Sequence, residues 1–294
     1  QYGGAIYNNG SSAKLGDIKG DFIGNSDSIG GAIANIGGYY ASTPANISSI
    51  TGNFIANKAE ESGGAIYNKD GTIGDITGDF IGNYAAASGE NARGGAIYND
   101  GTIGDITGDF IGNYAASGKN ASGGAIYNYR GTIGDITGDF IGNYAASGKN
   151  ASGGAIYNEY GTIGDITGDF IGNYASGEYA SGGAIYNYRG TIGDITGDFI
   201  GNYAAGNYAY GGAISNNDGT ISAITGDFIG NYAAGESAYG GAISNHGTIG
   251  DITGDFIGNY AAGESANGGA IANIGIIGQT TPDGNIMPDS GIVN

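Results

Sequence analysis

Paired aspartates recur along the chain in the phrase GDITGD or a close variant of it, always four residues apart. Carboxylate oxygens are the ligands that calcium prefers, and two carboxylates also serve glycoside hydrolysis. If the pairs stack in successive units, each like-charged neighbour costs about 1 kcal/mol in bulk water, which a bridging cation would relieve. The pairs are Asp17/Asp21, Asp75/Asp79, Asp105/Asp109, Asp135/Asp139, Asp165/Asp169, Asp194/Asp198 and Asp251/Asp255.

Two interpretations of these pairs stay open. In the first they bind calcium, although the spacing differs from the glycine-rich nonapeptide of calcium-binding β-rolls. In the second they are turn residues that bond their own backbone and point into solvent. We expect no bound cofactor, with calcium as the one candidate. A catalytic site is normally a unique constellation, whereas these pairs recur seven times, so we also expect no enzyme activity.

Other side chains with chemical potential lie in the variable turns and loops. Arg93 and His246 belong to this group, and no single unit combines them into a catalytic set. Tyr and Arg are favoured contact residues at interfaces. The turns therefore predict a partner-binding ridge, unless their tyrosines only shield strand edges. The ridge comprises Tyr129, Arg130, Tyr160, Tyr188 and Arg189.

Composition excludes several classes of partner. The formal net charge is −19 and no basic stripe is present, so nucleic acid and anionic membrane surfaces are not expected to bind. Cysteine is absent, which rules out disulfides and thiol chemistry. No apolar run approaches the ~18 residues of a membrane span. Gln1 already lies inside a repeat unit, so we expect the chain to be a processed or excised piece.

Two co-phased phrases divide the chain into units of about thirty residues. GGAI occurs ten times, starting at Gly3, Gly30, Gly63, Gly94, Gly123, Gly153, Gly182, Gly211, Gly240 and Gly268. FIGN, once FIAN, occurs nine times and contains every phenylalanine of the chain. These are Phe22, Phe54, Phe80, Phe110, Phe140, Phe170, Phe199, Phe228 and Phe256.

The unit pattern predicts an all-β fold, a right-handed parallel β-helix (β-solenoid) of about ten coils with three short strands per coil. Short Ile and Phe runs separated by Gly, Asn and Asp are typical of strands between tight turns. The three sides are assigned to GGAIYN, TIGDI and DFIGN, with the remaining eight to ten residues as a solvent-facing loop. A rise of ~4.8 Å per coil gives a rod of ~50 Å.

Side-chain directions follow from the strand period of two. We predict that the phenylalanines stack inward as a core column, and that Ile81 and its equivalents lie outside. Ile73 and Ile76 are both buried only if the backbone bends between them. The asparagines that end GGAIYN and FIGN are expected at corners, each bonding its counterpart one coil away.

The array is predicted to span residues 1–273, and residues 274–294 to form a degenerate terminal coil or cap. The pattern weakens after GGAIAN, and two of the three prolines, Pro282 and Pro288, lie in this tail. Proline blunts strand edges, so we expect the tail to close the stack or to lead into another domain.

GGAIYN followed by F-x-x-N-x-A resembles the paired repeats of the polymorphic outer-membrane protein passengers of autotransporter systems. The resemblance covers Gly3 to Asn273, and the long alternating strands of that family's translocator barrel are not part of the match. It implies a right-handed parallel β-helix displayed outside a Gram-negative-type cell, often in adhesion.

These observations lead to a functional hypothesis with two alternatives. The expected function is a non-enzymatic extracellular structural or adhesive module on a bacterial surface. Its partners would be a host or neighbouring cell-surface protein or glycan, or a second copy end to end. A self-assembling extracellular fibre subunit is the first alternative, and an exported polysaccharide lyase or hydrolase is the second.

Overall fold

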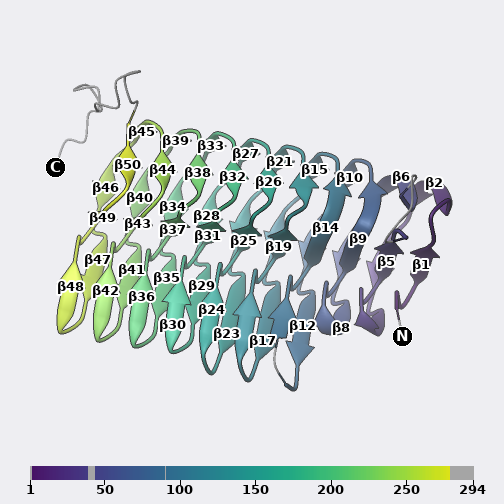
Figure 1. Ribbon diagram of the computed structural model, residues 1–294, viewed down its shortest axis with the longest axis horizontal. Coiled ribbons are helices and arrows are strands. Elements are labelled where there is room, and N and C mark those ends of the chain that lie inside the picture. The colour runs from purple at the N-terminus through teal and green to yellow at the C-terminus, as the bar shows by residue number, and fades with distance from the viewer. Residues whose placement is uncertain (1, 39–43, 90, 279–294) are drawn as a thin grey trace.

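The chain forms a parallel β-solenoid of about nine coils, as the repeat pattern predicts. The computed structural model describes residues 2–38, 44–89 and 91–278, and no helix occurs in these ranges. Successive coils lie side by side along one axis, with the N-terminal coil at one end of the rod and β50 (Ile276–Ile277) at the other (Figure 1).

The coil that begins at Gly123 illustrates the path of the chain. The motif GGAI leads into β19 (Ile126–Tyr129), and the next two short strands share the phrase GTIGDIT. The phrase DFIGN supplies a two-residue strand, and the last two strands come from the segment that differs most between units. The strands after β19 are β20 (Thr132–Ile133), β21 (Ile136–Thr137), β22 (Phe140–Ile141), β23 (Tyr144–Ser147) and β24 (Asn150–Ser152).

Equivalent residues of successive coils align in three parallel sheets, with local register shifts at Asp27/Ile29 and Asp100/Thr102. In the largest sheet β19 pairs with β25 (Ile156–Glu159), so that Ile126 aligns with Ile156. The second sheet contains only Phe-Ile strands, and Phe140 aligns with Phe110 and Phe170. Its members are β3 (Phe22–Ile23), β7 (Phe54–Ile55), β11 (Phe80–Ile81), β16 (Phe110–Ile111), β22, β28 (Phe170–Ile171), β34 (Phe199–Ile200), β40 (Phe228–Ile229) and β46 (Phe256–Ile257).

The core is a set of straight side-chain columns. All nine phenylalanines stack on their neighbours with ring centroids 4.7 to 4.8 Å apart, which confirms the predicted inward column. Ile73 and Ile76 are both fully buried, because β9 (Ile66–Ile73) ends and β10 (Ile76–Thr77) begins across a bend at Gly74-Asp75. Ile23 and Ile257 are 63% and 52% exposed, and the equivalents between them are partly exposed, so this series lies outside as predicted.

Two asparagine ladders run beside the core and confirm the expected amide-to-amide bonding. In the first ladder the amide of Asn128 donates to Oδ1 of Asn158 at 2.9 Å and also to the carbonyl of Gly131. In the second, Asn143 donates to Asn173 at 3.0 Å and to the carbonyl of Phe110 at 2.8 Å. Each buried amide thus bonds both its counterpart in the neighbouring coil and a nearby backbone carbonyl, so its hydrogen-bonding groups are not left unpaired in the core.

The variable segment is not the solvent-facing loop that the sequence pattern suggests. In each full-length coil it runs out along one strand and back along another, and both strands pair with their counterparts in the neighbouring coils. We call this projection the fin, with an outgoing arm (β23 and equivalents) and a returning arm (β24 and equivalents). It forms the row of narrow loops below the rod in Figure 1. The fin comprises residues 84–89 with 91–93, 114–122, 144–152, 174–181, 203–210, 232–239 and 260–267.

Alanine fills the space between the two arms. Ala145 on the outgoing arm and Ala151 on the returning arm are fully buried, and the same holds for their counterparts from Ala85 to Ala238. The pattern predicts a loop here because alanine and glycine carry little strand propensity. These segments nevertheless form strands, because stacking gives each arm backbone hydrogen bonds to the coils on either side.

The described array reaches β50, within the segment predicted to be a terminal coil or cap. β50 still pairs with β44 (Thr248–Ile249), so the stacked pattern continues to Ile277. Residues 279–294, with Pro282 and Pro288, lie outside the described residues, and so does the predicted cap.

Candidate functional site: a lateral groove beside the fin

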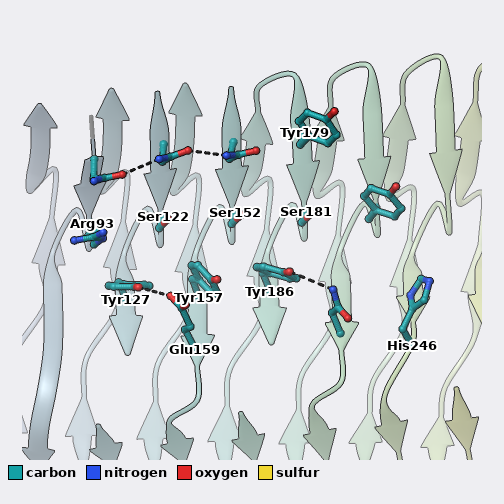
Figure 2. Close-up of a pocket in the computed structure, with 15 residues that line it drawn as sticks. Arg93, Ser122, Tyr127, Ser152, Tyr157, Glu159, Tyr179, Ser181, Tyr186 and His246 are labelled. Atoms are coloured by element: carbon teal, nitrogen blue, oxygen red, sulfur yellow. Dashed lines mark hydrogen bonds between the residues drawn. The ribbon is translucent and has the colours of Figure 1, made fainter. Parts of the chain in front are cut away.

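A groove of about 600 Å³ runs along the rod between the returning arm of the fin and the IYN strands of the coils. Residues from Asn91 to His246 line it, so it crosses coil after coil rather than sitting within one. Figure 2 shows these side chains in rows parallel to the axis, with Arg93 near one end and His246 near the other.

Tyrosines that follow GGAI form the floor of the groove. Because the preceding Ile faces the core, these tyrosines point away from it, as the strand period predicts, yet the fin keeps them from solvent. Tyr127 is only 4% exposed, and its ring lies 5.1 Å from that of Tyr157, which lies 4.8 Å from Tyr186. Burial raises the pKa of Tyr186 to about 12 and raises the pKa of Tyr127 and Tyr157 further.

The returning arm supplies the wall in two further columns. At its base Ser122, Ser152 and Ser181 form one row along the groove (Figure 2). At its tip the amide of Asn120 donates to Asn91 and that of Asn150 donates to Asn120, both at 2.7 Å. This tip column then changes to aromatic residues, since Asn150 aligns with Tyr179.

Tyr179 and Tyr208 form an exposed aromatic pair at the tip of the wall. Tyr179 lines the groove, and its ring stacks on that of Tyr208 with centroids 4.8 Å apart and an interplanar angle of 6°. The two side chains are 38% and 36% exposed, in contrast to the buried floor tyrosines.

Floor and wall exchange their large residues along the rod. Coils with Tyr on the floor at 127, 157 and 186 carry Ser at the base of the wall at 122, 152 and 181. In the next two coils the arrangement reverses, with Ser215 and Ser244 on the floor and Tyr210 and Tyr239 on the wall. Because each of these coils holds one large and one small residue, the groove keeps its width while its aromatic side crosses from floor to wall.

Three ionisable residues that differ in type from their counterparts in the neighbouring coils also line this groove. Arg93 lies over the Tyr127 ring with 5.8 Å to the centroid, and the Tyr127 hydroxyl donates to Oε2 of Glu159 in the following coil (Figure 2). His246 lies three coils beyond Glu159. The sequence predicts no such gathering, because Arg93 precedes the GGAI motif while Glu159 and His246 follow it, and only the fin brings these positions to one surface.

The five residues of the predicted ridge lie together at the rim of this groove. The Arg130 guanidinium lies over the rings of Tyr129 and Tyr160, at 5.0 and 5.9 Å, and Arg189 lies over Tyr188 at 5.1 Å. The rings of Tyr160 and Tyr188 meet edge to face at 5.4 Å. The ridge joins the groove floor directly, since the rings of Tyr127 and Tyr129 lie 6.1 Å apart.

Backbone strain accompanies the ridge. Arg130, Tyr160 and Arg189 have φ values of 57°, 57° and 53°, a left-handed conformation that bulky residues seldom adopt. Glycine would occupy these corners without strain. Strained backbone of this kind concentrates at functional sites, so the choice of Arg and Tyr here favours a contact role for their side chains.

The paired aspartates form two further ladders, away from the groove. Oδ1 of Asp105 accepts the backbone N–H of Asp135 at 2.9 Å, and Oδ1 of Asp109 accepts that of Asp139, also at 2.9 Å. The expectation that each Asp bonds its own backbone is therefore wrong, because the acceptor serves the next coil. Within the described ranges no group of three or more His, Cys, Asp and Glu side chains is arranged to hold a metal ion.

Fold and groove together define a parallel β-solenoid repeat protein with a lateral groove. Comparison with known proteins found no matching family model, no similar curated protein and no similar solved structure. Over residues 2–38, 44–89 and 91–278, no helix is long and apolar enough to cross a membrane.

Proposed function

We propose that the protein is a non-enzymatic, rod-shaped adhesive module displayed outside a bacterial cell, related to the polymorphic outer-membrane protein passengers. The solenoid supplies reach, and the groove with its Tyr/Arg rim supplies contact with a protein or glycan of a host or neighbouring cell. The observation that carries the proposal is the placement of all three arginines of the chain on one side of the rod, with Arg93 in the tyrosine-lined groove and Arg130 and Arg189 on the tyrosine-rich ridge beside it.

The spacing of the groove's ionisable residues supports a binding role over a catalytic one. Glu159 and His246 lie three coils apart, about 14 Å at ~4.8 Å per coil, which is too far for the two to act on one bond. Glu159 already accepts a hydrogen bond from Tyr127. The repeated columns favour a ligand held over many coils.

Bead adhesion tests this function directly. Fluorescent beads coated with the chain are incubated with epithelial cells and with Gram-negative bacteria, and retained beads are counted. We expect retention on at least one cell type. The matched variant carries Arg130→Gly, Tyr160→Gly and Arg189→Gly, which removes three of the five ridge side chains while placing glycine at left-handed corners that suit it.

Retention that the ridge variant lowers would support the adhesive proposal, and no retention on any cell type would contradict it. Electron microscopy of the purified chain distinguishes the adhesive module from the alternative, a self-assembling fibre subunit. The adhesive module predicts single particles about 45 Å long, from nine coils at ~4.8 Å, whereas continuous filaments would favour a self-assembling subunit.

A further inference from the structure

We propose that the groove binds a single extended chain of a neutral polysaccharide, lying parallel to the rod axis with about one sugar unit per coil. This inference rests on the binding role proposed above and names the ligand class of the same site.

The repeat of the groove matches a polymer of short, identical units. Equivalent rings lie 4.8 Å apart for Tyr157 and Tyr186, and 4.8 Å apart for Tyr179 and Tyr208. One sugar of an extended glycan advances by about the length of one coil, so each successive sugar lies opposite the side chains of one further coil. An extended peptide repeats its side-chain direction only every ~6.6 Å, and it would drift out of step within two coils.

Backbone pairing also disfavours a peptide. A peptide that joins a sheet needs a free strand edge. β19 on the floor is already paired with both β14 (Ile97–Ile103) and β25. β18 (Asn120–Ser122) on the wall is likewise paired with both β13 (Asn91–Arg93) and β24. The ligand therefore meets side chains and not backbone.

Those side chains have the chemistry that a sugar requires. Sugar rings combine apolar C–H surfaces with a rim of hydroxyls, and the exposed rings of Tyr179 and Tyr208 provide both apolar area and a hydroxyl. The Ser column donates and accepts through its hydroxyls. The tip amides of Asn120 and Asn150 keep further donor and acceptor capacity beyond their ladder bonds.

Charge favours a neutral polymer over an anionic one. The chain carries a formal net charge of −19, which repels polyanions at a distance. Among the residues that line the groove, the charges of Arg93 and Glu159 offset each other, and on the ridge Arg189 is paired with Asp218 at 3.3 Å. The groove lining therefore has no excess of positive charge that would attract a polysaccharide carrying uronate or sulfate groups.

The experiment measures binding of soluble β-glucan, mannan and xylan by affinity electrophoresis, with alginate and polygalacturonate as anionic comparisons. The groove variant carries Tyr179→Ser and Tyr208→Ser, because Ser237 occupies this position in the next coil without loss of pairing. The control carries Tyr203→Ser and Tyr232→Ser, which removes an equally stacked pair, at 5.1 Å, from the other arm of the fin.

We expect at least one neutral polysaccharide to bind, the groove variant to lose about tenfold or more in affinity, and the control to lose less than about twofold. No binding of any neutral polysaccharide, stronger binding of the anionic ones, or an equal loss in the control would overturn the inference. If polysaccharide binding fails but the coated beads still adhere through the ridge, the adhesive function is retained and its partner is a protein.

Discussion

The side-chain amide of Asn143 donates to Oδ1 of Asn173 at 3.0 Å and to the carbonyl of Phe110 at 2.8 Å. Its own Oδ1 accepts both the backbone N–H and the amide of Asn113, at 2.9 and 3.0 Å. One fully buried residue thus joins two neighbouring coils to its own and closes a corner of the solenoid.

Replacing this residue is predicted to be costly. Asn143→Ala leaves four partner groups of the corner without their bonds, which we expect to lower the free energy of unfolding by about 3 kcal/mol or more. The measurement is the midpoint of urea unfolding. Asn150→Ala is the control, because its ladder lies on the half-buried groove wall and its loss costs about 1 kcal/mol. Equal effects would contradict the assigned role of the corner ladder.

The phenylalanine column gives a second prediction. Phe140 is fully buried between Phe110 and Phe170, at 4.8 Å from each ring. Phe140→Ala is expected to lose about 3–5 kcal/mol through lost burial and a cavity. Ile141→Ala, on the outward side of the same two-residue strand, should lose much less. Calorimetric melting of both variants compares them, and a larger loss for the Ile141 variant would reverse the assigned direction of the strand.

Much of this arrangement follows from the sequence because a residue type confined to one repeat position must form a column once the units stack. The phenylalanine core, the outward Ile series and both Asn ladders are predictable on that basis. The groove is not, since its wall belongs to the fin, and alanine and glycine carry no strand signal of their own. Pairing across coils, which a single unit does not reveal, turns those segments into sheet.

Gly138 and Gly142 of one unit are required for different reasons, the first by close packing of two coils and the second by its backbone conformation. Gly142 has φ of +60° and open space where an added Cβ would lie, so Gly142→Ala should cost about 1 kcal/mol from backbone strain alone. At Gly138 an added Cβ would lie 2.1 Å from the carbonyl oxygen of Gly108 in the preceding coil. Gly138→Ala should therefore separate two coils and lower the melting temperature far more. Similar melting temperatures for the two variants would argue against coils packed this closely.

Alkaline pH is predicted to destabilise the groove floor. Burial raises the pKa of Tyr67 and of Tyr186 from 10.0 to about 12. The folded chain therefore holds more protons than the unfolded chain between about pH 10 and 12, and stability is constant below pH 10 and falls above it. Tyrosinate absorbance should still be rising near pH 12, as Tyr67 and Tyr186 ionise. A single phase centred near pH 10 with no loss of stability would contradict the buried floor.

Tyr186→Phe isolates this effect, because it keeps the ring and removes the ionisable hydroxyl. We expect the variant to lose less stability than the parent chain as the pH rises from 10 to 12. The hydroxyl receives one bond, from the Asn217 amide at 3.5 Å, so its removal should change stability little at neutral pH.

Each coil consists of about thirty residues and stacks on its neighbours in the same register. Deletion of residues 131–160 tests this stacking most directly. Asn128 and Asn158 occupy equivalent places thirty residues apart, so this deletion removes one full coil and rejoins the same register. Solution X-ray scattering should show a folded rod shorter by about 4.8 Å, while deletion of residues 131–145 should unfold the array locally. An unfolded product from the full-coil deletion, or a rod of unchanged length, would contradict the stacked solenoid.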